Sequence, residues 1–361
     1  MAQLLTPAVA EPPSMMGPLP DNDRLASDAD RLGSPKRSMV GDLRQPLPYP
    51  NGWFMVSLGH DVTRGQVRTV PFMGQELVLY RTASGLARAI EPYCPHLGAH
   101  LGHGGKVQGE DLICPLHGLV FGPDGRCLRA SYGEKPHRAA LTGRHMKEVN
   151  GAILVWTDSD NRPPTWDVPE HDLSNFCPPG YTRHHLRGQA HDAVENGVDL
   201  AHFVWLHGFT DARMSHRIDA HLFETTLDAR WKGQQLTVHF LNYGVGHAVV
   251  AFSMPALGLR MKSLGYFTQT APFTWTLVSG EALSISRVER LPGIVRNLSY
   301  AVLGPLAQYW VQRLVAPDLP IWNAKSYLPR PKLTGTDATA AAHRRWASQF
   351  YPTLTDRSEG A

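Results

Sequence analysis

The sequence has few cysteines, little net charge and no long apolar run. Four cysteines in 361 residues provide no disulfide framework and suit a reducing compartment, so we expect a cytoplasmic protein. A formal net charge of +3 is too small to indicate nucleic-acid binding. No stretch of about 18 apolar residues occurs, and the Pro-rich start lacks the basic region of a secretory signal. The sequence therefore predicts neither a transmembrane segment nor a secretory leader.

The spacing of strands and turns predicts two folded domains. Residues 1–45 are rich in Pro, Asp, Arg and Ser, which favours a disordered or loosely docked arm. Residues 46–160 alternate short apolar stretches with glycine turns, a pattern typical of a small all-β domain. Residues 161–351 are expected to form a second domain, and residues 352–361 a tail.

The second domain shows both strand and helix patterns. Within 182–210 a strand is expected to lead into a helix that begins near Ala193. The stretch 219–290 predicts one broad antiparallel sheet, because Pro and Gly divide it into short apolar runs. Helical spacing follows later in the chain. The expected strands are 221–227, 235–241, 247–252, 264–270, 275–279 and 283–289, and the later helices are 297–316 and 336–350.

Two clusters of cysteine and histidine lie in the first domain. They read Cys94-Pro95-His96 and Cys114-Pro115-Leu116-His117. A Rieske [2Fe–2S] centre needs this donor set, with two thiolates on one iron and two imidazoles on the other. Zinc also accepts two Cys and two His, although the order here is not that of a zinc finger. The pattern thus predicts a metal site, with zinc as the alternative.

A second constellation of potential metal ligands follows in the second domain. On one helix, Asp199 and His202 would share a face, and a widened turn at the end of the helix would place His207 on that same face. Two His and one carboxylate with open positions form the facial triad of non-haem Fe(II) oxygenases. Since the chain has 18 histidines, this pattern taken alone can arise by chance.

Both motifs resemble those of Rieske ring-hydroxylating oxygenases. Respiratory Rieske proteins usually have an extra cysteine in each of the two cluster loops. This sequence has Ala99 and Leu116 at those positions instead. The segment 195–207 resembles the iron motif of the oxygenase α subunits. Asn196 receives no role, because its spacing to Asp199 is shorter than in naphthalene-dioxygenase-like members.

The C-terminal segment resembles that of 3-ketosteroid 9α-hydroxylase oxygenases and sterol 7-desaturases. The stretch 316–351 carries the likeness, with an Asp before an Ile-Trp pair. The resemblance implies that Asp318 is the carboxylate ligand of the iron, beside His202 and His207. The alternative is that Asp318 caps a helix.

The resemblance also implies a fold and separate roles for two metal sites. The fold would be α+β, with an N-terminal all-β Rieske domain followed by a helix-grip (START-like) antiparallel-sheet catalytic domain. Cys94, His96, Cys114 and His117 would hold the [2Fe–2S] cluster, and a mononuclear Fe(II) would use O₂ as co-substrate. In the family, the residue matching Asp199 links an iron-ligand His, here His202, to a Rieske His of a neighbouring subunit, within a homotrimer.

Electron supply and substrate follow less directly from the sequence. No G-x-G-x-x-G follows a predicted strand, so we expect a separate reductase and/or ferredoxin. The resemblance implies hydroxylation or desaturation of a lipophilic, polycyclic small molecule. Arylamine N-oxygenation and natural-product tailoring on the same scaffold are alternatives. Two non-enzymatic alternatives are a Rieske electron carrier and a lipid-binding protein with a helix-grip cavity.

Overall fold

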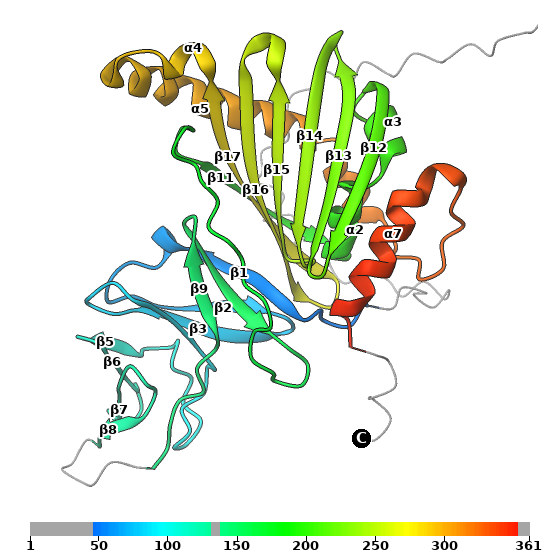
Figure 1. Ribbon diagram of the computed structural model, residues 1–361. Coiled ribbons are helices and arrows are strands. Elements are labelled where there is room, and N and C mark those ends of the chain that lie inside the picture. Colours follow the sequence, from blue (N-terminus) through cyan, green and yellow to red (C-terminus); the bar gives the residue numbers. More distant parts are fainter. Residues whose placement is uncertain (1–45, 131–137, 353–361) are drawn as a thin grey trace, which may run out of the picture. The chain divides into compact units, whose positions relative to one another are not determined.

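The computed structural model describes residues 46–130 and 138–352 (Figure 1). The expected N-terminal arm, 1–45, and residues 353–361 of the expected tail lie outside this part of the chain. Residues 1–45 and the rest of the chain are separate units, and the description below concerns the second unit.

The first part of this unit contains three small antiparallel sheets, in agreement with the predicted all-β domain. The strands are short, between two and seven residues long, and turns that contain glycine separate many of them. In strand order, the sheets are β1 (Gly52–Leu58), β10 (Ala152–Thr157) and β9 (Met146–Val149); β2 (Val67–Phe72), β3 (Gln75–Arg81) and β4 (Ala87–Ile90); and β5 (Lys106–Gln108), β6 (Asp111–Ile113), β7 (Val120–Phe121) and β8 (Cys127–Arg129).

The hairpin between β2 and β3 shows how the local sequence builds these sheets. Met73 and Gly74 form the turn, with φ values of 49° and 75°. Two consecutive positive φ angles produce the tight turn whose twist matches paired strands. Val70 therefore pairs with Leu77, and both are buried.

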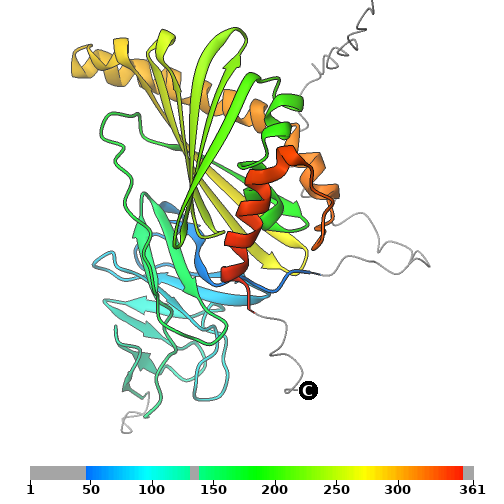
Figure 2. The ribbon, with the colours of Figure 1, turned by 45° about the vertical axis from the view of Figure 1, so that its right-hand side comes forward.

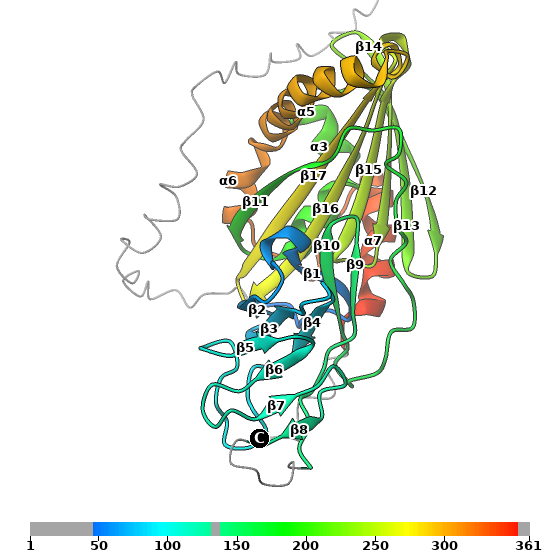
Figure 3. The ribbon, with the colours of Figure 1, turned by 90° about the vertical axis from the view of Figure 1, so that its left-hand side faces the viewer.

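The second part contains one seven-stranded antiparallel sheet, which confirms the predicted broad sheet (Figures 1 and 3). Every neighbouring pair in it is antiparallel. In order across the sheet, the strands are β11 (Gly180–Arg187), β17 (Thr274–Ile285), β16 (Leu259–Ala271), β15 (His247–Met254), β14 (Gln234–Tyr243), β13 (Leu222–Trp231) and β12 (Thr210–Asp219).

One strand prediction in this sheet is wrong. The expected strands 275–279 and 283–289 are a single strand, β17, followed by the short helix α4 (Ser286–Glu289). Gly280 lies between the two expected strands, and glycine was read as dividing the apolar runs. The ladder continues because Gly280 pairs with Tyr181 on one side and Leu264 on the other.

Helices cover the face of the sheet that carries the functional site. The long helix α5 (Gly293–Val315) packs on β17 and β11, as a helix-grip fold requires (Figure 3). Helix α7 (Ala338–Ala347) contacts β12 (Figure 2). Among the helices of the described residues, none is both long and apolar enough to cross a bilayer. The remaining helices of the described residues are α2 (Ala190–Asn196), α3 (Leu200–Trp205) and α6 (Asp318–Ala324), with 3-10 turns at Gly59–Asp61, Pro255–Leu257, Gly335–Asp337 and Ser348–Phe350.

Candidate metal centres

The two cysteine-histidine clusters occupy two loops of the same design. Cys94 follows β4 and Cys114 follows β6. In each loop, the cysteine carbonyl accepts a hydrogen bond from a glycine N–H: Gly98 to Cys94 at 2.9 Å, and Gly118 to Cys114 at 3.1 Å. Both glycines have left-handed backbone, with φ of 73° and 64°, which residues with a Cβ rarely adopt. The loops therefore present matched cysteine and histidine side chains.

The four side chains of these loops form a donor set suited to a [2Fe–2S] cluster. Cys94 and Cys114 are both buried, and burial raises the pKa of the Cys94 thiol to about 11. The imidazoles of His96 and His117 lie together at the half-buried edge, with ring centroids 4.9 Å apart. Paired thiols with paired imidazoles match the two thiolates and two His of a Rieske centre.

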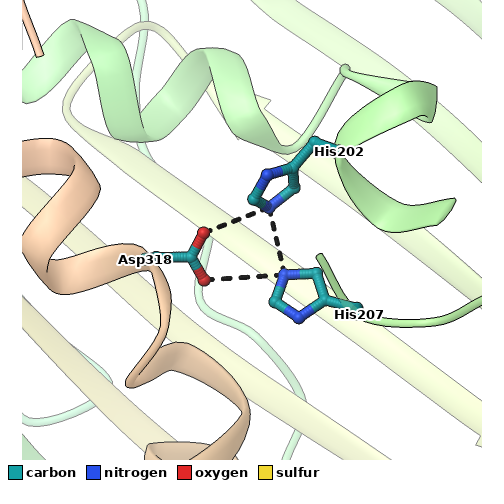
Figure 4. Close-up of side chains that lie close together, drawn as sticks. All are labelled: His202, His207 and Asp318. Atoms are coloured by element: carbon teal, nitrogen blue, oxygen red, sulfur yellow. Dashed lines mark hydrogen bonds and ion pairs between the residues drawn. The ribbon is translucent and has the colours of Figure 1, made fainter. Parts of the chain in front are cut away.

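The second group of ligands converges on one point (Figure 4). The Nε2 atoms of His202 and His207 lie 3.0 Å apart. Asp318 approaches both rings, with Oδ1 3.2 Å from His202 Nε2 and Oδ2 3.5 Å from His207 Nε2. Ligand atoms bound to one metal at about 2.1 Å in a facial arrangement lie about 3 Å apart. These three side chains therefore have the geometry of a facial triad.

The electrostatics of this group also fit a bound cation. Burial lowers the pKa of His202 and of His207 to about 4, so both imidazoles are neutral and offer a lone pair. Burial raises the pKa of Asp318 to about 7. A carboxylate held in such surroundings lacks a compensating positive charge, which a divalent metal ion would supply.

The backbone around these ligands differs from the sequence prediction. A single helix beginning near Ala193 was expected, with Asp199 and His202 on one face. Instead, α2 begins at Ala190 and ends at Asn196, and α3 begins at Leu200. Asp199 is the N-cap of α3, and its Oδ1 accepts a hydrogen bond of 3.0 Å from the His202 backbone N–H. Asp199 therefore helps to fix the start of the helix that carries His202.

Asn196 is a site residue that the sequence analysis left without a role. One end of its amide lies 3.3 Å from Asp318 Oδ1. In the amide orientation that satisfies both ends, Oδ1 accepts a hydrogen bond from Trp322 Nε1 at 2.8 Å. Asn196 thus ties the end of α2 to α6, which carries Asp318. In the sequence, the only indication of this role is the polar pair Glu195-Asn196 shortly before Asp199.

An apolar cavity of about 220 Å³ opens beside the three ligands. His202, His207 and Asp318 belong to its wall, and the remaining lining is mostly apolar. Within α3, Phe203 lines the cavity, whereas Val204 is exposed. Other lining residues are Phe240, Phe252, Leu277, Val311 and Trp322.

A buried charge cluster fixes α2 next to this cavity. Glu195 of α2 forms a two-pronged ion pair with Arg344 of α7, one contact being 2.8 Å from Nη2 to Oε2. Lys325 approaches Glu195 Oε2 at 3.6 Å and Asp192 Oδ1 at 3.1 Å. These contacts connect α2, which precedes His202 and His207, to the C-terminal segment.

Arg344→Ala is expected to lower the apparent melting temperature by about 6 to 15 °C, because it leaves the buried Glu195 carboxylate without its main partner. Arg345→Ala is the matched control: Arg345 is exposed on the same helix, and its loss should change little. Adding Glu195→Gln to Arg344→Ala should recover part of the lost melting temperature, because the double variant no longer buries an unpaired charge. Equal melting temperatures for the two arginine variants would contradict this assignment.

Comparisons with known proteins identify the family of both parts of the chain. Residues 52–141 match the family described as Rieske [2Fe-2S] domain, and residues 155–351 match the 3-Ketosteroid 9alpha-hydroxylase C-terminal domain. Cholesterol 7-desaturase nvd 1 of Ciona intestinalis is 32% identical over 90% of this chain and 74% of its own length. The oxygenase component of 3-ketosteroid-9-alpha-monooxygenase from Rhodococcus rhodochrous is 23% identical, covering 93% and 90%.

A solved structure shows the same fold. Dicamba monooxygenase bound to 3,6 dichlorosalicylic acid matches with a TM-score of 0.64 and 17% identity, covering 83% of this chain and 97% of that one. The predicted fold class and resemblance are confirmed, and the two non-enzymatic alternatives are excluded. The chain belongs to the Rieske oxygenases of the 3-ketosteroid 9α-hydroxylase type, enzymes that use a Rieske [2Fe–2S] cluster, a mononuclear iron and O₂.

Proposed function

We propose that this chain hydroxylates or desaturates a lipophilic polycyclic molecule, of the sterol or ketosteroid class on which its relatives are named to act. His202, His207 and Asp318 hold the mononuclear iron. Cys94, His96, Cys114 and His117 hold the cluster. The observation that carries the proposal is the facial group of ligands in the wall of an apolar cavity.

The side chains prepare this site for oxidation of an apolar substrate. When bound, the cluster supplies single electrons and the iron activates O₂. The neutral imidazoles of His202 and His207 and the carboxylate of Asp318 occupy one side of the metal position. Phe203, Phe240 and Trp322 line the cavity beside these three side chains, where they would exclude water and hold the substrate through apolar contacts.

The electron donor and the assembly are part of the proposal. A separate reductase and/or ferredoxin supplies the electrons, and the chain acts as a homotrimer in the cytoplasm. Asp199 links His202 to His117 of a neighbouring copy. Two features support the link: the Asp199 side chain is half-buried next to a ligand, and the exposed Leu116 adjoins His117 at the surface. The Rieske domain spans 46–160 and the catalytic domain 161–351.

Product analysis tests the reaction. The purified protein, with a surrogate reductase and O₂, is expected to oxidise cholesterol or a 3-ketosteroid, with iron bound in addition to the cluster iron. Mass spectrometry distinguishes addition of oxygen from loss of two hydrogens. Full iron content without oxidation of any sterol would contradict the substrate class, whereas absence of the additional iron would contradict the metal site.

Cys94→Ala is expected to abolish the Rieske absorption and EPR signals, because it removes a thiolate ligand of the cluster. The catalytic domain should remain folded and keep its mononuclear iron. Cys177→Ala serves as the control, since Cys177 is also buried but lies outside both loops. A normal Rieske EPR spectrum in the Cys94→Ala variant would overturn the ligand assignment.

A further inference from the structure

The sheet that forms the floor of the apolar cavity contributes four polar side chains to it, those of Asn242, Ser263, Ser279 and Glu281. Ser263 of β16 pairs in register with Glu281 of β17, and the next inward-facing pair places Ser279 beside Gly265. All four residues line the cavity. This part of the floor belongs to the sheet, whereas His202 and Asp318 project from helices that cover it. A molecule in the cavity therefore lies between the iron ligands and the polar floor.

Glu281 is an unusual residue for such a place. It is only 2% exposed, yet it carries a carboxyl group into a mostly apolar cavity. One oxygen, Oε2, accepts a hydrogen bond from the Ser263 hydroxyl. The other oxygen, Oε1, has no hydrogen-bond partner among the described residues. Burial raises the pKa of this carboxyl group, and the Ser279 hydroxyl is near enough to lower it in part. A buried oxygen without a well-formed hydrogen bond is nevertheless costly, which favours a molecule in the cavity that supplies one.

The surroundings of Glu281 select for an uncharged partner. Burial raises the pKa of Glu281 to about 7, so the neutral acid is well populated near neutral pH. In residues 46–130 and 138–352, no Lys, Arg or His forms an ion pair with it. A neutral carboxyl group can donate to a ketone or hydroxyl oxygen and accept from a hydroxyl.

Ser279 is held ready for the same role. Its Oγ accepts a hydrogen bond of 3.2 Å from Gln312 Nε2 of α5. Gln312 Oε1 in turn lies 2.7 Å from His184 Nε2 of β11. Because Ser279 accepts from the Gln312 side, its own O–H is directed elsewhere. Glu281 and a cavity-bound oxygen are the available acceptors.

We propose that Glu281, with Ser263 and Ser279, binds one uncharged oxygen of the substrate, a hydroxyl or a ketone, and so determines which carbon faces the iron ligands. This inference deepens the proposed function and rests on it. The row of the sheet that holds Glu281 and Ser263 continues through Val250 to Phe240, whose ring lies 5.4 Å from that of Phe203 on α3. The polar anchor and the metal-bearing helix thus bound the same substrate space.

A binding experiment with matched ligands tests the proposal. The ligands are cholesterol, cholest-4-en-3-one and cholest-5-ene, which carry a hydroxyl, a ketone and no oxygen. Binding to the metal-loaded protein is followed by tryptophan fluorescence, since Trp322 lines the cavity. Wild type should bind the two oxygenated ligands about ten- to a hundredfold more tightly than cholest-5-ene.

Two substitutions separate recognition from structure. Glu281→Leu should bind all three ligands with similar affinity, whereas Glu281→Gln should retain part of the preference because its amide still forms hydrogen bonds. Glu224→Gln is the control, since Glu224 of β13 pairs with Arg217 at an exposed position of the same sheet. The Rieske spectrum and iron content verify that each variant is folded.

The outcomes are distinct. Equal affinities in wild type, or a preference that persists in Glu281→Leu, would overturn the anchor and leave the oxygenase proposal intact. An oxygen preference lost in Glu281→Leu, without oxidation of any ligand, would support the anchor and contradict the proposed reaction. A wild-type protein that binds none of the three would overturn both the sterol class and the anchor.

Discussion

The Asp318→Ala variant is expected to lose the mononuclear iron and to turn over more than about a hundredfold more slowly. This loss would exceed the one expected on replacing a residue that only forms a hydrogen bond to a metal ligand. Its carboxylate is the anionic member of the group, with oxygens 3.2 Å and 3.5 Å from the two Nε2 atoms. Two neutral imidazoles alone hold Fe(II) weakly, because the negative ligand and one coordination bond are gone.

Metal analysis and spectroscopy check this prediction separately. The Rieske spectrum should be unchanged, since Cys94 and Cys114 belong to other loops. Asp211→Ala is the control, because Asp211 is 79% exposed in its side chain and follows the histidine motif closely. Full iron occupancy together with normal activity in Asp318→Ala would mean that another carboxylate serves as the ligand.

The Asp199→Asn variant is expected to bind both metal groups and substrate, yet to pass electrons from the cluster at least about a hundredfold more slowly. Asparagine caps helices as well as aspartate does, so the hydrogen bond to the His202 backbone N–H and the start of α3 should survive. The substitution removes the negative charge of the side chain and replaces one carboxylate oxygen, a hydrogen-bond acceptor, by an NH₂ group, a donor. The substitution therefore tests the proposed link without displacing His202.

Single-turnover kinetics provide the measurement. The cluster is reduced beforehand, substrate and O₂ are added, and its reoxidation is followed optically. Asp211→Asn, at an exposed position, should behave as wild type. Reoxidation at the wild-type rate in Asp199→Asn would refute the bridging role. Loss of iron from this variant would instead indicate that Asp199 supports the metal site itself.

The parts of the site that a short motif encodes were accessible from sequence. Cys94, His96, Cys114 and His117 lie in two loops whose residue order is characteristic of the cluster. The proximity of His202 to His207 followed from their spacing. Asp318 required the likeness of the C-terminal segment, because no local pattern reveals that α6 begins beside α3.

The features that sequence reasoning missed depend on tertiary packing. Glu281 lies between the two expected strands 275–279 and 283–289, and the sequence analysis gave it no role. Its role emerges only when β16 places Ser263 opposite it and the cavity is visible. Likewise, the sequence does not reveal that Gly197, the C-cap of α2, lies against Phe240, where a Cβ would be 3.3 Å from the ring.

The facial ligand group has a consequence for the folding of the chain. His202 and His207 flank the end of α3, whereas Asp318 begins α6, far along the sequence. A metal ion that binds only the native arrangement stabilises it by mass action and closes the long loop between these segments. Iron starvation would therefore act as more than a loss of activity. It would loosen the attachment of α6 to the sheet, exposing the C-terminal segment to proteases before the rest of the protein unfolds.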